Sequence, residues 1–124
     1  MPQFILLLRG GKEAWQHFSP EETQQMMQAY FDWTDQLRRD GRLQGSAPLQ
    51  DGGRVLRPSD GRGAVDGPYT ETKEAVAGYT LISASDEAEA VELARNCPTL
   101  THGGLVEVRE IREVTTTGDS PARV

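Results

Sequence analysis

Cysteine and histidine, two side chains often used for metal binding and covalent chemistry, are scarce in this sequence. Cys97 is the only cysteine, so the chain can form neither an intramolecular disulfide nor a thiolate metal cluster. We expect Cys97 to be a small buried residue near a helix end rather than a catalytic thiol. The two histidines, His17 and His102, lack the short spacing of zinc ligands. Without a phosphate-binding loop, dinucleotide-binding motif or nucleophile elbow, the sequence predicts no metal and no cofactor.

Positive charge and long apolar runs are also lacking. The chain has 13 Lys and Arg residues against 19 Asp and Glu residues, a net charge of −6. An acidic surface repels phosphate backbones, so we expect no direct contact with nucleic acid. No apolar run is long enough to span a bilayer, and the N-terminus lacks the pattern of a signal peptide. The sequence therefore predicts no membrane association and a cytoplasmic location.

The composition is that of one globular domain. Of the 124 residues, 36% are hydrophobic and 26% are charged, enough for one core in a chain of this length. We assign residues 1–114 to the domain. Residues 115–124 are mostly small and polar, and we predict that this C-terminal tail is disordered.

Two stretches of the domain have apolar side chains on both faces of a strand. They are residues 4–8 and residues 75–83, and strands of this kind usually lie in the middle of a sheet. A helix is predicted to begin at Ser19, which forms a capping box with Glu22, and to end near Gly41. A second helix begins at residues 85–87 with a capping side chain and first-turn acids.

The remaining segments are shorter. Residues 12–18 and 99–104 are predicted to be loops, and the last strand runs from residue 105 to about residue 114. Residues 42–49 form an extended segment that contains Gly45, Ser46 and Ala47. These small side chains leave room either for a ligand or for a neighbouring helix.

An additional hairpin is predicted in the second half of the domain. Residues 51–53 read Asp-Gly-Gly, a hairpin turn signal. Residues 54–58 form a short strand, and residues 59–63 form a second turn before Ala64. This arm either clamps a site or mediates contact between subunits.

The order of elements predicts the fold. Strand, helix, strand, hairpin arm, strand, helix and strand form two right-handed β-α-β halves, which is the ferredoxin-like split arrangement of an α+β domain. The first and third main strands are central in this topology, as their two-sided apolar character requires. Both helices then cover one face of the sheet. Because the other face keeps large apolar side chains, we predict a homodimer.

Residues 66–74 read Asp-Gly-Pro-Tyr-Thr-Glu-Thr-Lys-Glu. Gly67 and Pro68 make this stretch a rigid corner rather than a helix. The stretch resembles the signature of the DGPF group within the YCII-related family, with Tyr69 where many members have phenylalanine. The resemblance extends from about Gln3 to Ile111 and includes residues 106–109. It implies a ferredoxin-like fold of the dimeric α/β-barrel type.

The resemblance also bears on function. Some YCII-related proteins are thought to be enzymes that use a histidine on the first helix together with a carboxylate. The place of that histidine falls near Tyr30 here, and a tyrosine with a pKa near ~10 is a poor base at neutral pH. DGPF proteins often occur beside, or fused to, extracytoplasmic-function sigma factors, which implies a regulatory link through a protein partner.

Several polar side chains are candidate site residues. Asp66, Glu71 and Lys73 either converge on a small polar ligand or face water, with Asp66 in an Asx-turn. The hydroxyl of Tyr30 needs a partner or faces a cavity, and His102 either enters the pocket or is exposed. The residues that we expect to line a ligand site are Tyr30, Asp66, Tyr69, Glu71, Lys73 and His102.

Two hypotheses on function follow. The favoured one is a non-catalytic dimer that binds a small ligand or regulates a partner. The alternative is a small-molecule enzyme with lyase-like or dehydrochlorinase-like acid–base chemistry. In that case Asp66 or Glu71 is the acid–base group, Lys73 holds an anion and Tyr30 donates a hydrogen bond to the substrate.

Overall fold

Four antiparallel strands form the central sheet, in the order β2-β5-β1-β6. A computed structural model describes residues 1–56, 58, 64–66 and 75–113. The strands are β1 (Gln3–Arg9), β2 (Leu43–Pro48), β5 (Val76–Ser83) and β6 (Leu105–Glu110). The prediction that the first and third main strands are central is confirmed, because β1 and β5 occupy the two inner positions. The last strand ends at Glu110, earlier than predicted.

The two long helices begin where their capping residues predict. In α2 (Pro20–Arg39), the backbone N–H of Glu22 donates to Ser19 Oγ at 3.1 Å, and the N–H of Ser19 donates to Glu22 Oε1 at 2.9 Å. These two bonds form the predicted capping box. In α3 (Glu87–Ala94), Asp86 caps the helix by accepting from the N–H of Glu89 at 2.8 Å.

The predictions that residues 12–18 and 99–104 are loops are wrong, because each segment includes residues of a short helix. The first is α1 (Lys12–Gln16), which follows Gly11 at φ 79° and has no side-chain cap. The second is the 3₁₀-helix η3 (Pro98–His102), which ends at Gly103 with φ 86°. Pro98 follows α3, as expected of a helix stop, but it also begins η3, because proline suits the first turn of a helix. Helices this short leave little periodicity in the sequence.

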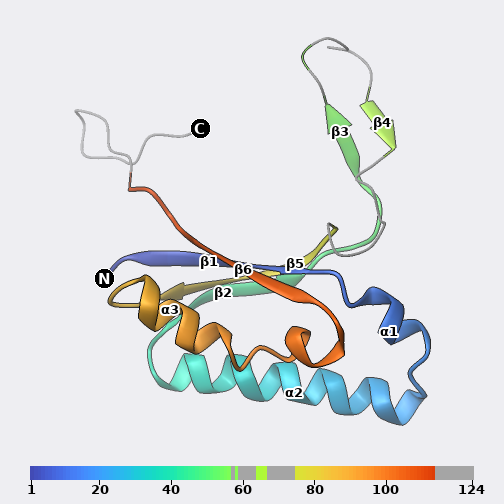
Figure 1. The fold of residues 1–124 in the computed structure, drawn as a ribbon, viewed down its shortest axis with the longest axis horizontal. Helices are drawn as coiled ribbons and strands as arrows, with labels where there is room; N and C mark the ends of the chain where they lie inside the picture. Colours follow the sequence, from blue (N-terminus) through green and yellow to red (C-terminus); the bar gives the residue numbers. More distant parts are fainter. Residues whose placement is uncertain (57, 59–63, 67–74, 114–124) are drawn as a thin grey trace.

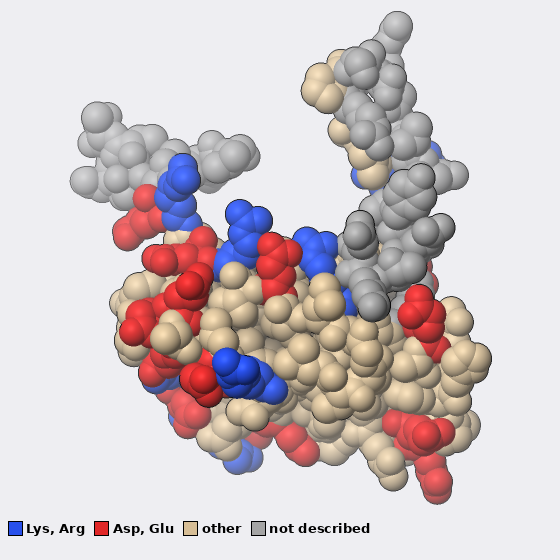
Figure 2. Space-filling model, viewed as in Figure 1, with Lys and Arg blue, Asp and Glu red and all other residues tan. Residues whose placement is uncertain are grey.

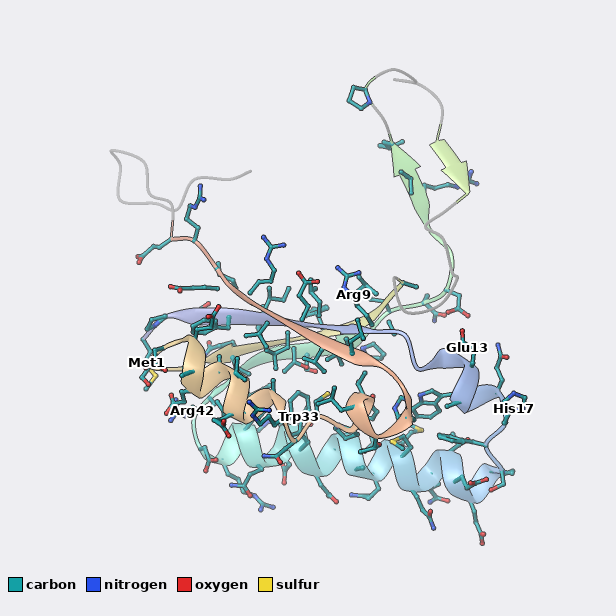
Figure 3. The ribbon with its side chains drawn as sticks, in the orientation of Figure 1. Met1, Arg9, Glu13, His17, Trp33 and Arg42 are labelled. Atoms are coloured by element: carbon teal, nitrogen blue, oxygen red, sulfur yellow. The ribbon has the colours of Figure 1, made fainter. Side chains whose placement is uncertain are left out.

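The helices α2 and α3 lie on the same side of the sheet, and the core lies between the two layers (Figure 1). Phe4, Leu6 and Ile82 of the central strands are fully buried there, in one core cluster with Trp33 of α2. Trp33 points toward α3, where its Nε1 donates to the carbonyl of Leu93 at 3.1 Å (Figure 3). Cys97 is buried at 1% exposure, which confirms its predicted place in the core.

No described helix covers the opposite face of the sheet. The side chains that alternate with the buried ones point to this open face, and the register pairs Ile5 with Leu81 and Leu7 with Tyr79. All four are half-buried. Figure 2 shows Lys or Arg side chains beside Asp or Glu side chains along this side. One such pair joins Arg9 and Glu107 at 3.0 Å.

A hairpin arm is present, but the predicted hairpin turn at residues 51–53 is wrong, because β2 pairs with β5 and not with the strand that follows it. Strands β3 (Arg54–Leu56) and β4 (Ala64–Asp66) pair antiparallel in a sheet of their own. Figure 1 shows this arm extending from the sheet on the side away from α2. The predicted turn at residues 59–63 and the predicted disordered tail at residues 115–124 lie outside the described residues. Within the described chain, no helix is both long and apolar enough to cross a membrane.

The observed architecture is therefore α+β, with an antiparallel sheet whose strand order is compatible with the ferredoxin-like fold. In this strand order β2 lies beside β5 at one edge of the sheet, and α2 connects β1 to β2 across β5. It is at this edge that the fold leaves an open space between helix and sheet.

Candidate functional site

A pocket of about 910 Å³ lies between α2 and the β2–β5 edge of the sheet. Its floor is made of small residues, namely Gly45, Ser46 and Ala47 of β2 and Gly78 of β5. Because these side chains are small, α2 and the two strands leave a gap between them rather than packing closely. Of the two predicted roles for the small residues of β2, room for a ligand is the one that this geometry supports.

The wall formed by α2 is mostly apolar. Met27 and Phe31 are one helical turn apart and line the pocket. They are also among the exposed large hydrophobic residues, at 48% and 60% exposure. Their side chains therefore give the cavity an exposed apolar edge.

Polar groups meet at the deep end of the pocket. The Tyr30 hydroxyl of α2 lies 2.5 Å from Thr99 Oγ1 and 3.2 Å from His102 Nε2, both on η3. Residues 30 and 102 are 72 positions apart in the sequence. The unpredicted helix η3 therefore places a hydroxyl and an imidazole against α2.

Aromatic rings surround the imidazole. The centroid of the Trp15 ring lies 5.7 Å from that of His102, at an interplanar angle of 83°. Trp15 also stacks on Tyr30, at 6.4 Å and 22°, and Phe18 contacts both Trp15 and His102. The short helix α1 positions Trp15, so the second unpredicted helix also builds the site.

The glycine before α1 allows the imidazole to pack closely against the backbone. Gly11 is buried, and a Cβ added there would lie 2.7 Å from His102 Nδ1 and 2.8 Å from its Cε1. Among the buried side-chain nitrogen and oxygen atoms of the described residues, Nδ1 of His102 is the one without a hydrogen-bond partner. The ring is thus fixed on one edge by packing and on the other by Tyr30.

Burial also sets the protonation of the neighbouring groups. Loss of solvent raises the pKa of Tyr30 to about 12, although its hydrogen bond with Thr99 acts in the opposite direction. The hydroxyl of Tyr30 therefore stays neutral at physiological pH and acts as a hydrogen-bonding group rather than a base. Burial likewise raises the pKa of the Cys97 thiol, so Cys97 is not an activated nucleophile.

The sequence was also compared with models of protein families. The sequence profile of the YCII-related domain matches residues 3–115. The chain belongs to the YCII-related family. A comparison with curated protein sequences finds no match.

The structure brings together two of the residues that the sequence nominated for a YCII-related site. Tyr30 and His102 both line the pocket and contact each other. Asp66 ends β4 and is paired in register with Arg54, but the described residues do not include its side chain. Tyr69, Glu71 and Lys73 lie outside the described residues. A site shared by Tyr30 and Asp66 therefore stays a prediction.

Trp15 and Thr99 are site residues that the sequence did not reveal. Both lie in segments predicted to be loops, and neither belongs to a recognisable motif. The available signal was the glycine spacing, because Gly11 precedes α1 and Gly103 and Gly104 follow η3. Clustered glycines indicate a close approach of the backbone, but they do not identify the side chain that makes it.

Proposed function

We propose that this YCII-related chain is a small-ligand-binding protein of the DGPF type that acts as a homodimer. The observation that supports the proposal is the pocket of about 910 Å³ between α2 and the β2–β5 edge of the sheet. Its volume lies within the range of small-molecule sites, and its walls combine apolar side chains with a few convergent polar groups. Such a pocket costs packing energy when it is empty, which a bound ligand recovers.

Ser46 offers a direct test of this pocket. It is exposed and lines the floor, where its hydroxyl bonds Thr80 Oγ1 at 2.9 Å. Replacing Ser46 by leucine places a large side chain in the cavity, whereas Ser46→Ala removes the hydroxyl without filling space. The uncharged fluorescent dye Nile red is a suitable probe of an apolar cavity.

We expect Nile red to bind the wild-type chain with a rise in fluorescence. Ser46→Leu should weaken this binding at least about tenfold, because overpacking removes the volume that the dye needs. Ser46→Ala should bind within about threefold of wild type, since it loses only a hydroxyl. Equal binding by wild type and Ser46→Leu would place the dye elsewhere and contradict the proposal.

A second candidate function is acid–base catalysis of the lyase or dehydrochlorinase type. The observation that favours it is the 3.2 Å contact between His102 Nε2 and the Tyr30 hydroxyl. An imidazole can accept a proton at neutral pH, and a neutral tyrosine can donate a hydrogen bond to a developing charge. In this version His102 is the proton acceptor in place of the first-helix histidine of the family's enzymes.

Catalysis and binding predict different fates for a bound molecule. An enzyme converts its ligand, and His102→Gln abolishes the conversion, whereas a binding protein returns the ligand unchanged by mass spectrometry. His17→Gln is the matched control, because His17 is exposed at the outer end of α1 (Figure 3). Conversion that survives His102→Gln would exclude the imidazole as the acid–base group.

The regulatory form of the proposal concerns a protein partner. Resemblance to DGPF proteins supports a link to an extracytoplasmic-function sigma factor, which the ligand-bound dimer would contact. Co-purification of the sigma factor with the chain, in the presence and absence of ligand, tests this link. Its failure would leave the ligand site itself unaffected.

A further inference from the structure

The chemistry of the pocket lining identifies the class of ligand that it takes. The described lining contains two residues with formally charged side chains, Arg38 and Asp51. Arg38 is 64% exposed and forms an ion pair with Asp35 at 3.0 Å. It lies eight residues beyond Tyr30 on α2, which is about 12 Å along a helix. The deep end therefore presents hydroxyls and an imidazole, and Arg38 lies far from it. Asp51 follows β2 and is exposed to water.

This arrangement disfavours an ionised ligand. A carboxylate or ammonium group taken from water into the deep end would lose its hydration shell. The side chains described as meeting there, those of Tyr30, Thr99 and His102, carry no carboxylate, ammonium or guanidinium group. Burying a charge without a partner costs far more than burying a hydroxyl that forms a hydrogen bond. The deep end thus selects for a neutral polar group.

Counting hydrogen-bond partners shows which neutral group fits. If His102 carries its proton on Nε2, it donates to the Tyr30 oxygen. The hydrogen between Tyr30 and Thr99 can belong to either oxygen, and in the arrangement counted here the Tyr30 hydroxyl donates. Nδ1 then keeps only a lone pair, whereas the opposite tautomer would bury an N–H without a described acceptor, which is rare in proteins. In this arrangement the Tyr30 oxygen still has one acceptor position.

The rest of the pocket favours an aromatic or apolar body. Trp15 lines the pocket beside Tyr30, and Met27 and Phe31 line its exposed side. Aromatic rings prefer to pack against other rings in offset or edge-on geometry. A flat apolar ligand can therefore lie between α2 and the floor of β2, with its polar group directed at Tyr30.

We infer that the pocket binds uncharged, largely apolar aromatic molecules that carry a hydroxyl group, and that this hydroxyl donates a hydrogen bond to the Tyr30 oxygen. This inference rests on the proposed ligand-binding function and specifies its ligand class. It assigns specificity to Tyr30, held in place by Thr99 and His102. The small residues of the floor leave the space for the ring system.

Three probes of matched shape test the inference by calorimetry on the whole chain at neutral pH. They are naphthalene, naphthol and naphthoate, the last two substituted at the same ring position. We expect naphthol to bind at least about tenfold more tightly than naphthoate, because only naphthoate is ionised. Naphthalene should lie between them. Naphthoate binding as tightly as naphthol would overturn the ligand class while leaving the pocket intact, and failure of all three to bind would overturn both proposals.

Tyr30→Phe separates the hydroxyl from the shape of the site. This variant should bring the affinity for naphthol down to that for naphthalene, a loss of about five- to tenfold, with naphthalene binding unchanged. Unchanged naphthalene binding shows that the variant is folded and its pocket intact. If Tyr30→Phe still bound naphthol more tightly than naphthalene by the same factor as wild type, the role of the Tyr30 oxygen would be overturned. If Tyr30→Phe does not fold, Thr99→Val provides the second test, because it removes the group that orients the Tyr30 hydroxyl.

Discussion

At the scale of single residues, the site depends on a glycine that leaves room for a neighbouring side chain. Gly11 has no Cβ, and this lets the imidazole of His102 approach its backbone. Its φ of 79° is also one that other residues rarely adopt. Gly41 has a similar φ of 73°, but a Cβ there would meet nothing within 4 Å. The two glycines therefore separate the effect of backbone strain from the effect of contact with His102.

We predict that Gly11→Ala harms the protein more than Gly41→Ala. Both substitutions carry the cost of a left-handed conformation, about 1–2 kcal/mol, but Gly11→Ala must also displace the His102 ring. The expected result is a lower melting temperature for Gly11→Ala and a loss of Nile red binding, with binding retained in Gly41→Ala. Thermal denaturation and dye titration measure the two effects. Equal melting temperatures and equal binding would show that the contact does not fix the ring.

At the scale of elements, local signals predicted the long helices and missed the short ones. Ser19 and Glu22 are close in sequence, so the order of the residues is enough to reveal their capping box. The helices α1 and η3 have five residues each, and neither has a capping side chain. Helices this short are stabilised by packing against the rest of the chain rather than by their own sequence.

The candidate site shows the same limit more clearly. Tyr30 and His102 were each nominated from the sequence, but their contact spans 72 positions and depends on how η3 packs against α2. No periodicity or motif encodes that distance. The signature at residues 66–74 indicated the family, and most of it lies outside the described residues. Its part in the pocket therefore stays a prediction.

An ion pair between elements provides a test of pH dependence. Arg42, which follows α2, binds Glu89 of α3 through two contacts, at 2.5 and 3.1 Å. The hydrogen bond from Arg42, followed by that from the Ser85 backbone, lowers the pKa of Glu89 below its ordinary value of 4.5. Since the folded-state pKa is the lower one, the stabilisation is fully present above about pH 4.5 and is lost as the pH falls through the folded-state pKa.

We predict that Glu89→Gln lowers the melting temperature at neutral pH and that this difference shrinks as the pH falls below 4.5. The matched control is Glu92→Gln, because Glu92 pairs with Arg95 on the exposed side of α3 at 70% and 65% exposure. Exposed pairs of this kind contribute little, so its melting temperature should follow wild type throughout. Thermal melts over a pH series decide the matter, and a Glu89→Gln deficit that persists unchanged in acid would contradict the assignment.

At the scale of the whole molecule, the order of elements was enough to predict the sheet. Two strands with apolar side chains on both faces could only be central, and the structure places β1 and β5 there. The same reasoning identifies an apolar sheet face that no described helix covers. Ile5, Leu7, Tyr79 and Leu81 share the open face and are only half-buried, although neighbouring residues of the same strands are fully buried. A second copy packed on this face would bury them.

We predict that the chain is a homodimer through this open face, with a mass by light scattering of twice 13.7 kDa. Leu7→Arg should yield monomers, because a dimer through this face would bury the new charges of both copies. The monomer itself should stay folded, since position 7 is only half-buried and faces, across β1 and β6, the carboxylate of Glu107, which already pairs with Arg9. Leu100→Arg is the control: Leu100 is 45% exposed on η3, away from the open face, and should remain dimeric. A wild-type chain that is monomeric at micromolar concentration, or a Leu7→Arg variant that stays dimeric, would show that the open face is not the interface.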